Sequence, residues 1–283
     1  MTATGPQQIV EPVLVDAHAH IWSANMPVSA AAWFKPGQAF TAEQYLAVLD
    51  THGIHFGVIA GISIFGYHND YMIGQLRRHK RLRGTAIVAP TTDLYTLERM
   101  KVDGVIGIRL QLTRQELPDL AGDDYRLLFR RIADLGLHIE VVVEGPRWPQ
   151  VLPLLEASGA NIVIDHFGHP DPQAGINCTG FQAVLRAVER GRTWVKLSAP
   201  FRLTWAAPGK PRDPLSVALA REAARCLFEN AGTERLVWGS DCPFVGHESS
   251  VTYADTLNEL NDWVPDAPTR RKLSETALKL FFS

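Results

Sequence analysis

Short apolar runs alternate with longer segments of helical periodicity along most of the chain. Eight runs read as strands because each is apolar and ends at turn-forming or polar residues. We expect these strands at 13–18, 56–61, 84–89, 105–110, 138–143, 161–165, 193–198 and 235–238. Such short, nearly continuous apolar runs are typical of a parallel sheet that is buried on both faces.

Helical segments separate the strands. We expect helices at 41–51, 69–79, 95–101, 125–135, 149–157, 180–189, 215–230, 251–263 and 269–282. Thr41 followed by Gln44 has the spacing of a capping box, and Asn69 is placed to cap the next helix. About eight strand–helix repeats predict an α/β protein, a distorted (β/α)₈ TIM barrel formed by a single domain over residues 13–283. Residues 1–12 are expected to be a flexible N-terminus.

Composition narrows the classes of partner. The 283 residues are 46% hydrophobic and 20% charged, with a formal net charge of −2, so a dedicated surface for nucleic acid or for anionic membranes is not expected. The three cysteines are widely spaced and form no disulfide framework. The chain shows neither a signal peptide nor an apolar run long enough to span a membrane, so we expect a cytoplasmic protein.

The first strand ends in the sequence Asp-Ala-His-Ala-His. On a regular strand, alternate side chains share a face, so His18, His20 and also Asp16 are expected to point the same way. Polar groups at the end of an apolar strand are costly unless they are paired or used. The two imidazoles can therefore bind one metal ion or one substrate oxygen.

Polar residues also gather at the ends of the later strands, where (β/α)₈ barrels carry their active sites. They are Ser63, Arg109, Gln111, Glu140, Glu144, Asp165, His166, His169, Lys196, Ser198, Arg202, Ser240 and Asp241.

Each of the main candidates has a structural alternative. Asp241 can act as a general base or a metal ligand, or it can be a helix N-cap residue in the following loop. His166 can be a hydrogen-bonded core residue. Arg109 must meet an anion, which is either an internal carboxylate or a carboxylate of the substrate. Arg202 and His169 lie in loops, where Arg202 can also be solvent-exposed. Cys242 lacks an adjacent base and is a weak candidate for a nucleophile.

Three segments together resemble the amidohydrolase superfamily. They are VDAHAH at 15–20, IDHFGHP at 164–170 and LVWGSDCP at 236–243. The chain is most similar to the lactonase branch, which includes pyrone dicarboxylate, sulfomuconate and sugar lactonases, and the resemblance extends over about 14–282.

The resemblance implies that Asp241 activates water to open a lactone ring, with His18, His20 and His166 polarising the carbonyl. Those four residues would also hold one divalent metal, Zn²⁺ or Mn²⁺, if a metal is used, and metal-independent activity is the alternative. Arg109, Arg202 and Ser63 match substrate-binding positions, and His169 is included with them.

Some positions depart from the family pattern. No lysine suited to carbamylation ends strand four or five, which argues against a binuclear centre, and Val142 and Phe244 replace residues that relatives use at the site. The aromatic residues Trp33, Phe34 and Trp205 are expected to cover the substrate ring.

The expected partner is an anionic small-molecule lactone of the kind formed in aromatic degradation, bound by a monomer or homodimer. The alternatives are a sugar lactonase, a metal-dependent decarboxylase of the same superfamily, and a ligand-binding barrel without chemistry.

Overall fold

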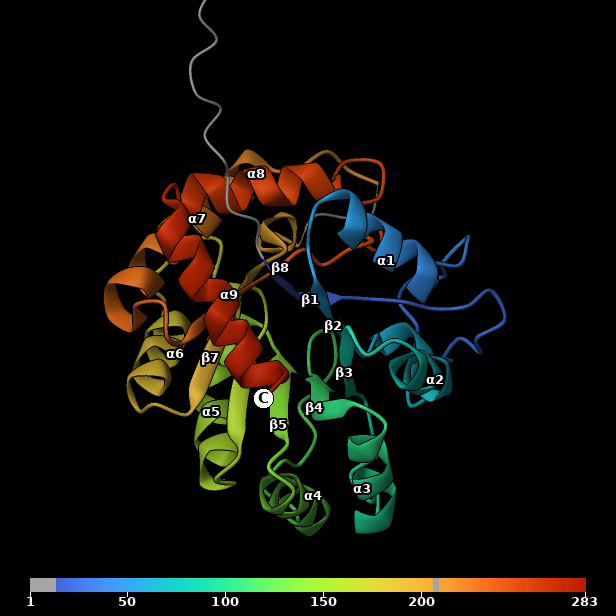
Figure 1. Ribbon diagram of the computed structural model, residues 1–283. Coiled ribbons are helices and arrows are strands. Elements are labelled where there is room, and N and C mark those ends of the chain that lie inside the picture. The colour runs from blue at the N-terminus through green and yellow to red at the C-terminus, as the bar shows by residue number, and fades with distance from the viewer. Residues whose placement is uncertain (1–13, 206–208) are drawn as a thin grey trace, which may run out of the picture.

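Eight parallel strands form the centre of the molecule (Figure 1). The computed structural model describes residues 14–205 and 209–283, so the predicted flexible N-terminus at 1–12 lies outside the described residues. The strands are β1 (Val15–Ala19), β2 (Phe56–Ala60), β3 (Leu82–Ala86), β4 (Val105–Gln111), β5 (His138–Val142), β6 (Asn161–Ile164), β7 (Thr193–Ser198) and β8 (Leu236–Gly239). Each pairs with the next in chain order, which confirms the predicted (β/α)₈ barrel.

Helices follow the strands and surround the barrel (Figure 1). They are α1 (Ala42–Thr51), α2 (Asp70–Arg78), α3 (Leu94–Val102), α4 (Asp123–Asp134), α5 (Trp148–Ala157), α6 (Thr179–Glu189), α7 (Pro214–Ala231), α8 (Tyr253–Trp263) and α9 (Ala267–Phe281). Short 3₁₀ turns follow four of the strands: η1 (Ser63–Phe65), η2 (Gly145–Arg147), η3 (His166–Gly168) and η4 (Pro200–Arg202). Among the described residues, no helix is both long enough and apolar enough to cross a bilayer.

Local sequence signals explain some element boundaries and miss others. The capping box of Thr41 and Gln44 forms as predicted at the start of α1. Asn69 precedes α2, but its side chain makes no capping bond and instead donates to the carbonyls of Tyr67 and Ile87. Strand β3 begins two residues before the predicted run, at Leu82, because its pairing with Gly57 of β2 sets its start.

The N-terminal end of the barrel is closed by apolar packing. Val15, Val58, Val163 and Val237 form a buried cluster with α9, which lies across this end of the barrel (Figure 1). Because this end is filled with apolar side chains, the polar residues at the opposite ends of the strands are left to line a pocket.

The prediction that Asp16 shares a face with His18 and His20 is wrong. The pairing of β1 with β2 shifts its register between Asp16 and Ala19, so the simple alternation of side chains breaks there. Asp16 lies outside the pocket and accepts hydrogen bonds from the hydroxyl groups of Ser240 (2.6 Å) and Tyr253 of α8 (2.9 Å). This carboxylate therefore ties β1 to the segment after β8.

The seam between β1 and β8 carries the residues of greatest interest. The amide of Asp241 donates to the carbonyl of His18, and the amide of His20 donates to the carbonyl of Cys242, both at 2.8 Å. Gly239 allows this close approach, since a Cβ atom there would lie 2.6 Å from the Cβ of His18. Closing the barrel therefore brings Asp241 against the two histidines.

Candidate active site

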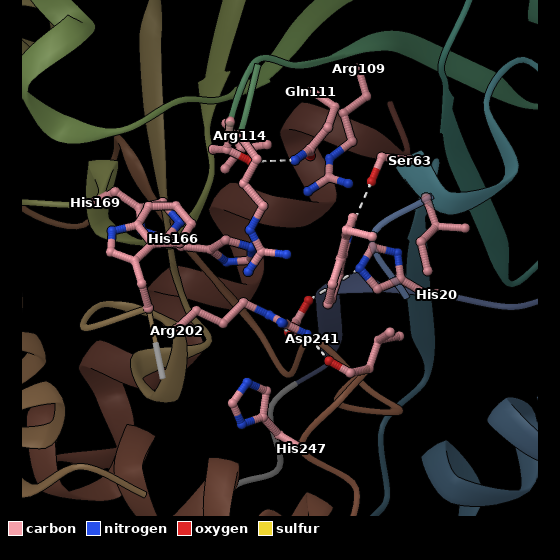
Figure 2. A pocket seen from close by; sticks show the side chains of 16 residues that line it. His20, Ser63, Arg109, Gln111, Arg114, His166, His169, Arg202, Asp241 and His247 are labelled. Atoms are coloured by element: carbon pink, nitrogen blue, oxygen red, sulfur yellow. Dashed lines mark hydrogen bonds and ion pairs between the residues drawn. The ribbon is translucent and has the colours of Figure 1, made fainter. Parts of the chain in front are cut away.

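A pocket opens at the carboxyl ends of the strands (Figure 2). Its lining includes seven of the predicted site residues: His20, Ser63, Arg109, His166, His169, Arg202 and Asp241. His18 lies beneath this lining and is fully buried, with its ring 5.0 Å from that of His20 and 4.8 Å from that of His166. The structure thus brings together the eight residues to which the resemblance assigns catalysis or substrate binding.

The backbone is strained around this pocket. Arg114, His166, His169, Trp205 and Asp241 all line it and all have positive φ values, between 45° and 65°. The left-handed conformation costs a non-glycine residue roughly 1–2 kcal/mol. Strain of this kind gathers at sites where side-chain placement matters more than local stability.

Asp241 is the centre of the site. One carboxylate oxygen, Oδ2, accepts from Nε of Arg202 at 2.6 Å, and the other, Oδ1, lies 3.2 Å from Nε2 of His20 and 3.5 Å from Nε2 of His18. Burial acts to raise the pKa of Asp241, but Arg202 and the bond to His20 outweigh it and hold this pKa well below its usual range. The carboxylate is therefore ionised at neutral pH.

Hydrogen bonds at Nδ1 orient two of the histidines around Asp241. His20 Nδ1 donates to the carbonyl of Ala60 at 2.8 Å, and His166 Nδ1 lies 2.8 Å from the hydroxyl of Ser198. Burial lowers the pKa of His18 to about 3 and that of His166 well below its usual value. Both rings are consequently neutral at pH 7 and can act as hydrogen-bonding groups.

Arg109 contacts a network of internal carboxylates, which is one of the two alternatives that the sequence left open, and it also lines the pocket. Its guanidinium lies 2.9 Å from Glu140 and 2.8 Å from Asp165, and it also donates to the carbonyl of Gly61. Lys196 completes the network and is fully buried. Burial acts to raise the pKa of Asp165, but Lys196 and Arg109 keep it well below its usual value.

Two further cationic side chains of the pocket, Arg114 and Arg202, lie outside this network, and Arg202 is paired with Asp241. Figure 2 shows Arg114 extending into the pocket near Arg202 and His166. Its guanidinium stacks over Trp33 at 4.2 Å, and Trp205 lies 5.9 Å away. Burial and the neighbouring charge of Arg202 lower the pKa of Arg114. Because Arg202 is already paired with Asp241, Arg114 is the guanidinium that a bound anion would stabilise more.

Two of the three expected aromatic residues line the pocket, whereas Phe34 packs beside Trp33 outside this lining. Trp33 donates to the hydroxyl of Ser63, and Trp205 stacks on His169 with ring centroids 4.5 Å apart. Burial lowers the pKa of His169 to about 4, so the stacked imidazole is neutral.

Arg114 and His247 line the pocket and were not singled out from the sequence. Arg114 lies five residues after Arg109 in a polar loop, and His247 lies six residues after Asp241, so position after a strand end was the only available signal. His247 supplies the pocket with a further imidazole. Val142 also lines the pocket, adding an apolar wall.

The donor set offers only a partial fit to a metal ion. Ligand atoms of His18, His166 and Asp241 lie within 4.8 Å of one another. A histidine that binds a metal normally donates its other ring N–H to an oxygen acceptor. His20 does so, but Nδ1 of His18 lies 3.0 Å from the ammonium group of Lys196, which can only donate. Oδ1 of Asp165, which can accept, also lies 3.2 Å from this Nδ1, so His18 can offer Nε2 to a metal only where Asp165 rather than Lys196 binds Nδ1.

Cys242 is not suited to nucleophilic chemistry. Its thiol is buried, and burial raises its pKa well above the usual value, with Asp16 and Asp241 adding to the effect. The neutral thiol packs into the core instead.

The fold and the site define a class of enzyme. The sequence profile of the amidohydrolase family matches residues 15–282, and the chain belongs to this family of hydrolases.

More specific similarities are to lactone hydrolases. The chain is 26% identical over 281 residues to 2-pyrone-4,6-dicarboxylate hydrolase of Comamonas testosteroni, covering 95% of this chain and 90% of that protein. It is 26% identical over 272 residues to 4-sulfomuconolactone hydrolase of Rhizobium radiobacter, covering 91% and 86%. The crystal structure of a probable 2-pyrone-4,6-dicarboxylic acid hydrolase from Acinetobacter baumannii, solved with citric acid, has a TM-score of 0.88 and 29% identity over 95% of this chain and 99% of that one.

Proposed function

We propose that this protein hydrolyses a lactone that carries at least one carboxylate group, of the kind met in aromatic degradation. The observation that carries the proposal is the arrangement of Asp241, which is ionised, buried between two histidines and faced by a pocket with two guanidinium groups. The similarity to two lactone hydrolases with anionic substrates supports the same assignment.

Asp241 is proposed to act as the general base. Oδ2 is held by Arg202, so Oδ1 is the oxygen that takes a proton from water as the water attacks the lactone carbonyl. The carbonyl oxygen becomes an oxyanion, which a hydrogen-bond donor on His18 and the neighbouring histidines would stabilise. Asp241 then returns the proton to the ring oxygen as the C–O bond breaks, giving a hydroxy acid.

Substrate carboxylates are proposed to bind to Arg114 and Arg202. Both groups line the pocket. Arg114 can make paired N–H bonds to a carboxylate, and Arg202, whose Nε is bound to Asp241, can add a bond from a terminal nitrogen. Trp33 and Trp205 would lie over the ring and exclude water, while Ser63 and His169 add polar contacts. Arg109 lines the pocket but is engaged by Glu140 and Asp165, so we assign it mainly to positioning these groups.

We propose that the reaction proceeds without a resident metal. The contact between Lys196 and His18 supports this choice over one Zn²⁺ or Mn²⁺ ion held by His18, His20, His166 and Asp241. When bound, such an ion would polarise the carbonyl as a Lewis acid. We further expect a cytoplasmic monomer or homodimer.

A panel of lactones tests the assignment, with acid release followed by a pH indicator. Carboxylated lactones should be hydrolysed much faster than neutral sugar lactones of similar size, and Asp241→Asn should abolish the difference. Release of CO₂ from aromatic acids without lactone hydrolysis would point to the decarboxylase alternative. Binding of carboxylated lactones without turnover would point to a ligand-binding barrel.

A further inference from the structure

A lysine lies inside the barrel, directly below the proposed site. Lys196 is on β7, and its side chain is completely buried. Its Nζ atom lies 2.7 Å from Oε2 of Glu140, 3.3 Å from Oδ1 of Asp165 and 3.0 Å from Nδ1 of His18. An ammonium group has three hydrogens and no acceptor, and these three neighbours supply one acceptor each.

The same three neighbours make up a group that could hold a metal ion. Ligand atoms of His18, Glu140 and Asp165 lie within 4.8 Å of one another. The ammonium group of Lys196 is within 3.3 Å of all three, so a positive charge of the protein already occupies the middle of this group.

The contact bears on where the proton of His18 lies. An ammonium group can only donate, so a hydrogen bond from Lys196 requires Nδ1 of His18 to accept and leaves that atom without a hydrogen. In the neutral ring the remaining hydrogen is then on Nε2. That atom is buried, has no other hydrogen-bond partner among the described residues, and lies 3.5 Å from Oδ1 of Asp241.

We propose that Lys196 is a positioning residue that fixes His18 in the tautomer with hydrogen on Nε2, so that His18 presents a hydrogen-bond donor to the substrate oxygen. The role of that donor rests on the proposed lactone hydrolysis, whereas the tautomer itself does not. The same contact denies the pocket a lone pair on His18, which is what a metal ion would need.

Asp165 provides the competing arrangement. Its Oδ1 lies 3.2 Å from Nδ1 of His18, close enough to accept a hydrogen once Lys196 no longer donates there. In Lys196→Met we therefore expect the hydrogen to move to Nδ1. The Nε2 lone pair would then face the pocket together with His166 and Asp241.

The experiment reads the tautomer by long-range ¹H–¹⁵N correlation spectra of protein labelled with ¹⁵N-histidine, without substrate. The His18→Asn variant identifies the resonances of His18. In the wild type we expect hydrogen on Nε2 of His18. Hydrogen on Nδ1 in the wild type would overturn the proposal, and this measurement stands even where a variant does not fold.

Lys196→Met supplies the second test, with Lys272→Met, at an exposed lysine of α9, as the matched control. In folded Lys196→Met we expect the tautomer to switch, kcat to fall about 10²–10³-fold, as for loss of one oxyanion donor, and the affinity for added ZnCl₂, measured by calorimetry, to rise at least tenfold. An unchanged tautomer or unchanged zinc affinity in that variant would contradict the proposal. If the wild type has the Nε2 tautomer but opens no lactone, only the proposed function fails.

Discussion

Replacing Arg109 with methionine separates an arginine that holds the structure from one that binds substrate. The sequence alone allowed either role for Arg109. In the structure its guanidinium contacts Glu140 and Asp165, both of which are fully buried. Methionine has a similar length but no charge, so the variant leaves two buried carboxylates with Lys196 as their remaining cation.

The magnitude follows from the burial of these groups. Removing one partner of a buried ion pair typically costs about 3–5 kcal/mol, because the other charge is left uncompensated. For a chain of this size each kcal/mol lowers the melting temperature by roughly 2–4 °C. We therefore expect Arg109→Met to melt about 6–20 °C below the wild type.

The assay is thermal unfolding by calorimetry, combined with kinetics on a carboxylated lactone. Arg77→Met is the control for stability, because the Arg77 side chain is largely exposed and its ion pair with Asp103 lies at the surface; it should melt like the wild type. Arg114→Met is the control for function. It should keep the melting temperature and raise KM about 10- to 100-fold, as expected for loss of a charged hydrogen bond to the substrate.

A particular result would refute this reasoning. If Arg109→Met melts like the wild type and raises KM as much as Arg114→Met does, the internal ion pairs contribute little and Arg109 binds the substrate directly.

Three further predictions concern chemistry, cofactor and pH. Asp241→Asn should lower kcat by about 10²–10⁴-fold because the general base is lost; near-normal turnover would exclude that role. Dialysis against a chelator should leave the rate of lactone hydrolysis unchanged, with the metal content of the protein followed by mass spectrometry. If activity is lost and returns only when Zn²⁺ or Mn²⁺ is added, the metal-free reaction is wrong. The free energy of unfolding should fall between pH 6.5 and pH 4. Burial lowers the pKa values of His18 and His138 to about 3 and that of His169 to about 4, below the unfolded value near 6.5, so the unfolded chain binds more protons in this range. Each such histidine lowers the free energy of unfolding by about 1.4 kcal/mol for each pH unit in this range. Urea titrations at pH 7, 6 and 5 measure this free energy, and equal values would contradict the prediction.

The fold was predictable because the strand and helix patterns are local and repeat in the order that a barrel requires. His166 and Asp241 could be found for a related reason, since each lies two residues after the end of an apolar strand and the carboxyl ends of barrel strands converge. A residue that enters the pocket simply because it follows the end of a strand can be predicted from a single sequence.

The partners of these residues could not be predicted in the same way. Arg109 and Arg202 are both arginines near strand ends, yet one contacts Glu140 and Asp165 and the other contacts Asp241. The difference depends on side-chain directions across several strands. Arg114 was missed for a similar reason: its place in the pocket depends on a positive φ and on stacking with Trp33, neither of which leaves a pattern in the sequence.

The first strand shows how one short segment serves three purposes. Val15 packs against α9 at the closed end of the barrel, Asp16 binds Ser240 outside the pocket, and His18 and His20 face Asp241. Regular alternation would put Asp16 on the same face as the histidines. The register shift separates them. The carboxylate of Asp16 is thereby kept at the β1–β8 seam. Inside the site, a second negative charge beside Asp241 would oppose the binding of an anionic lactone.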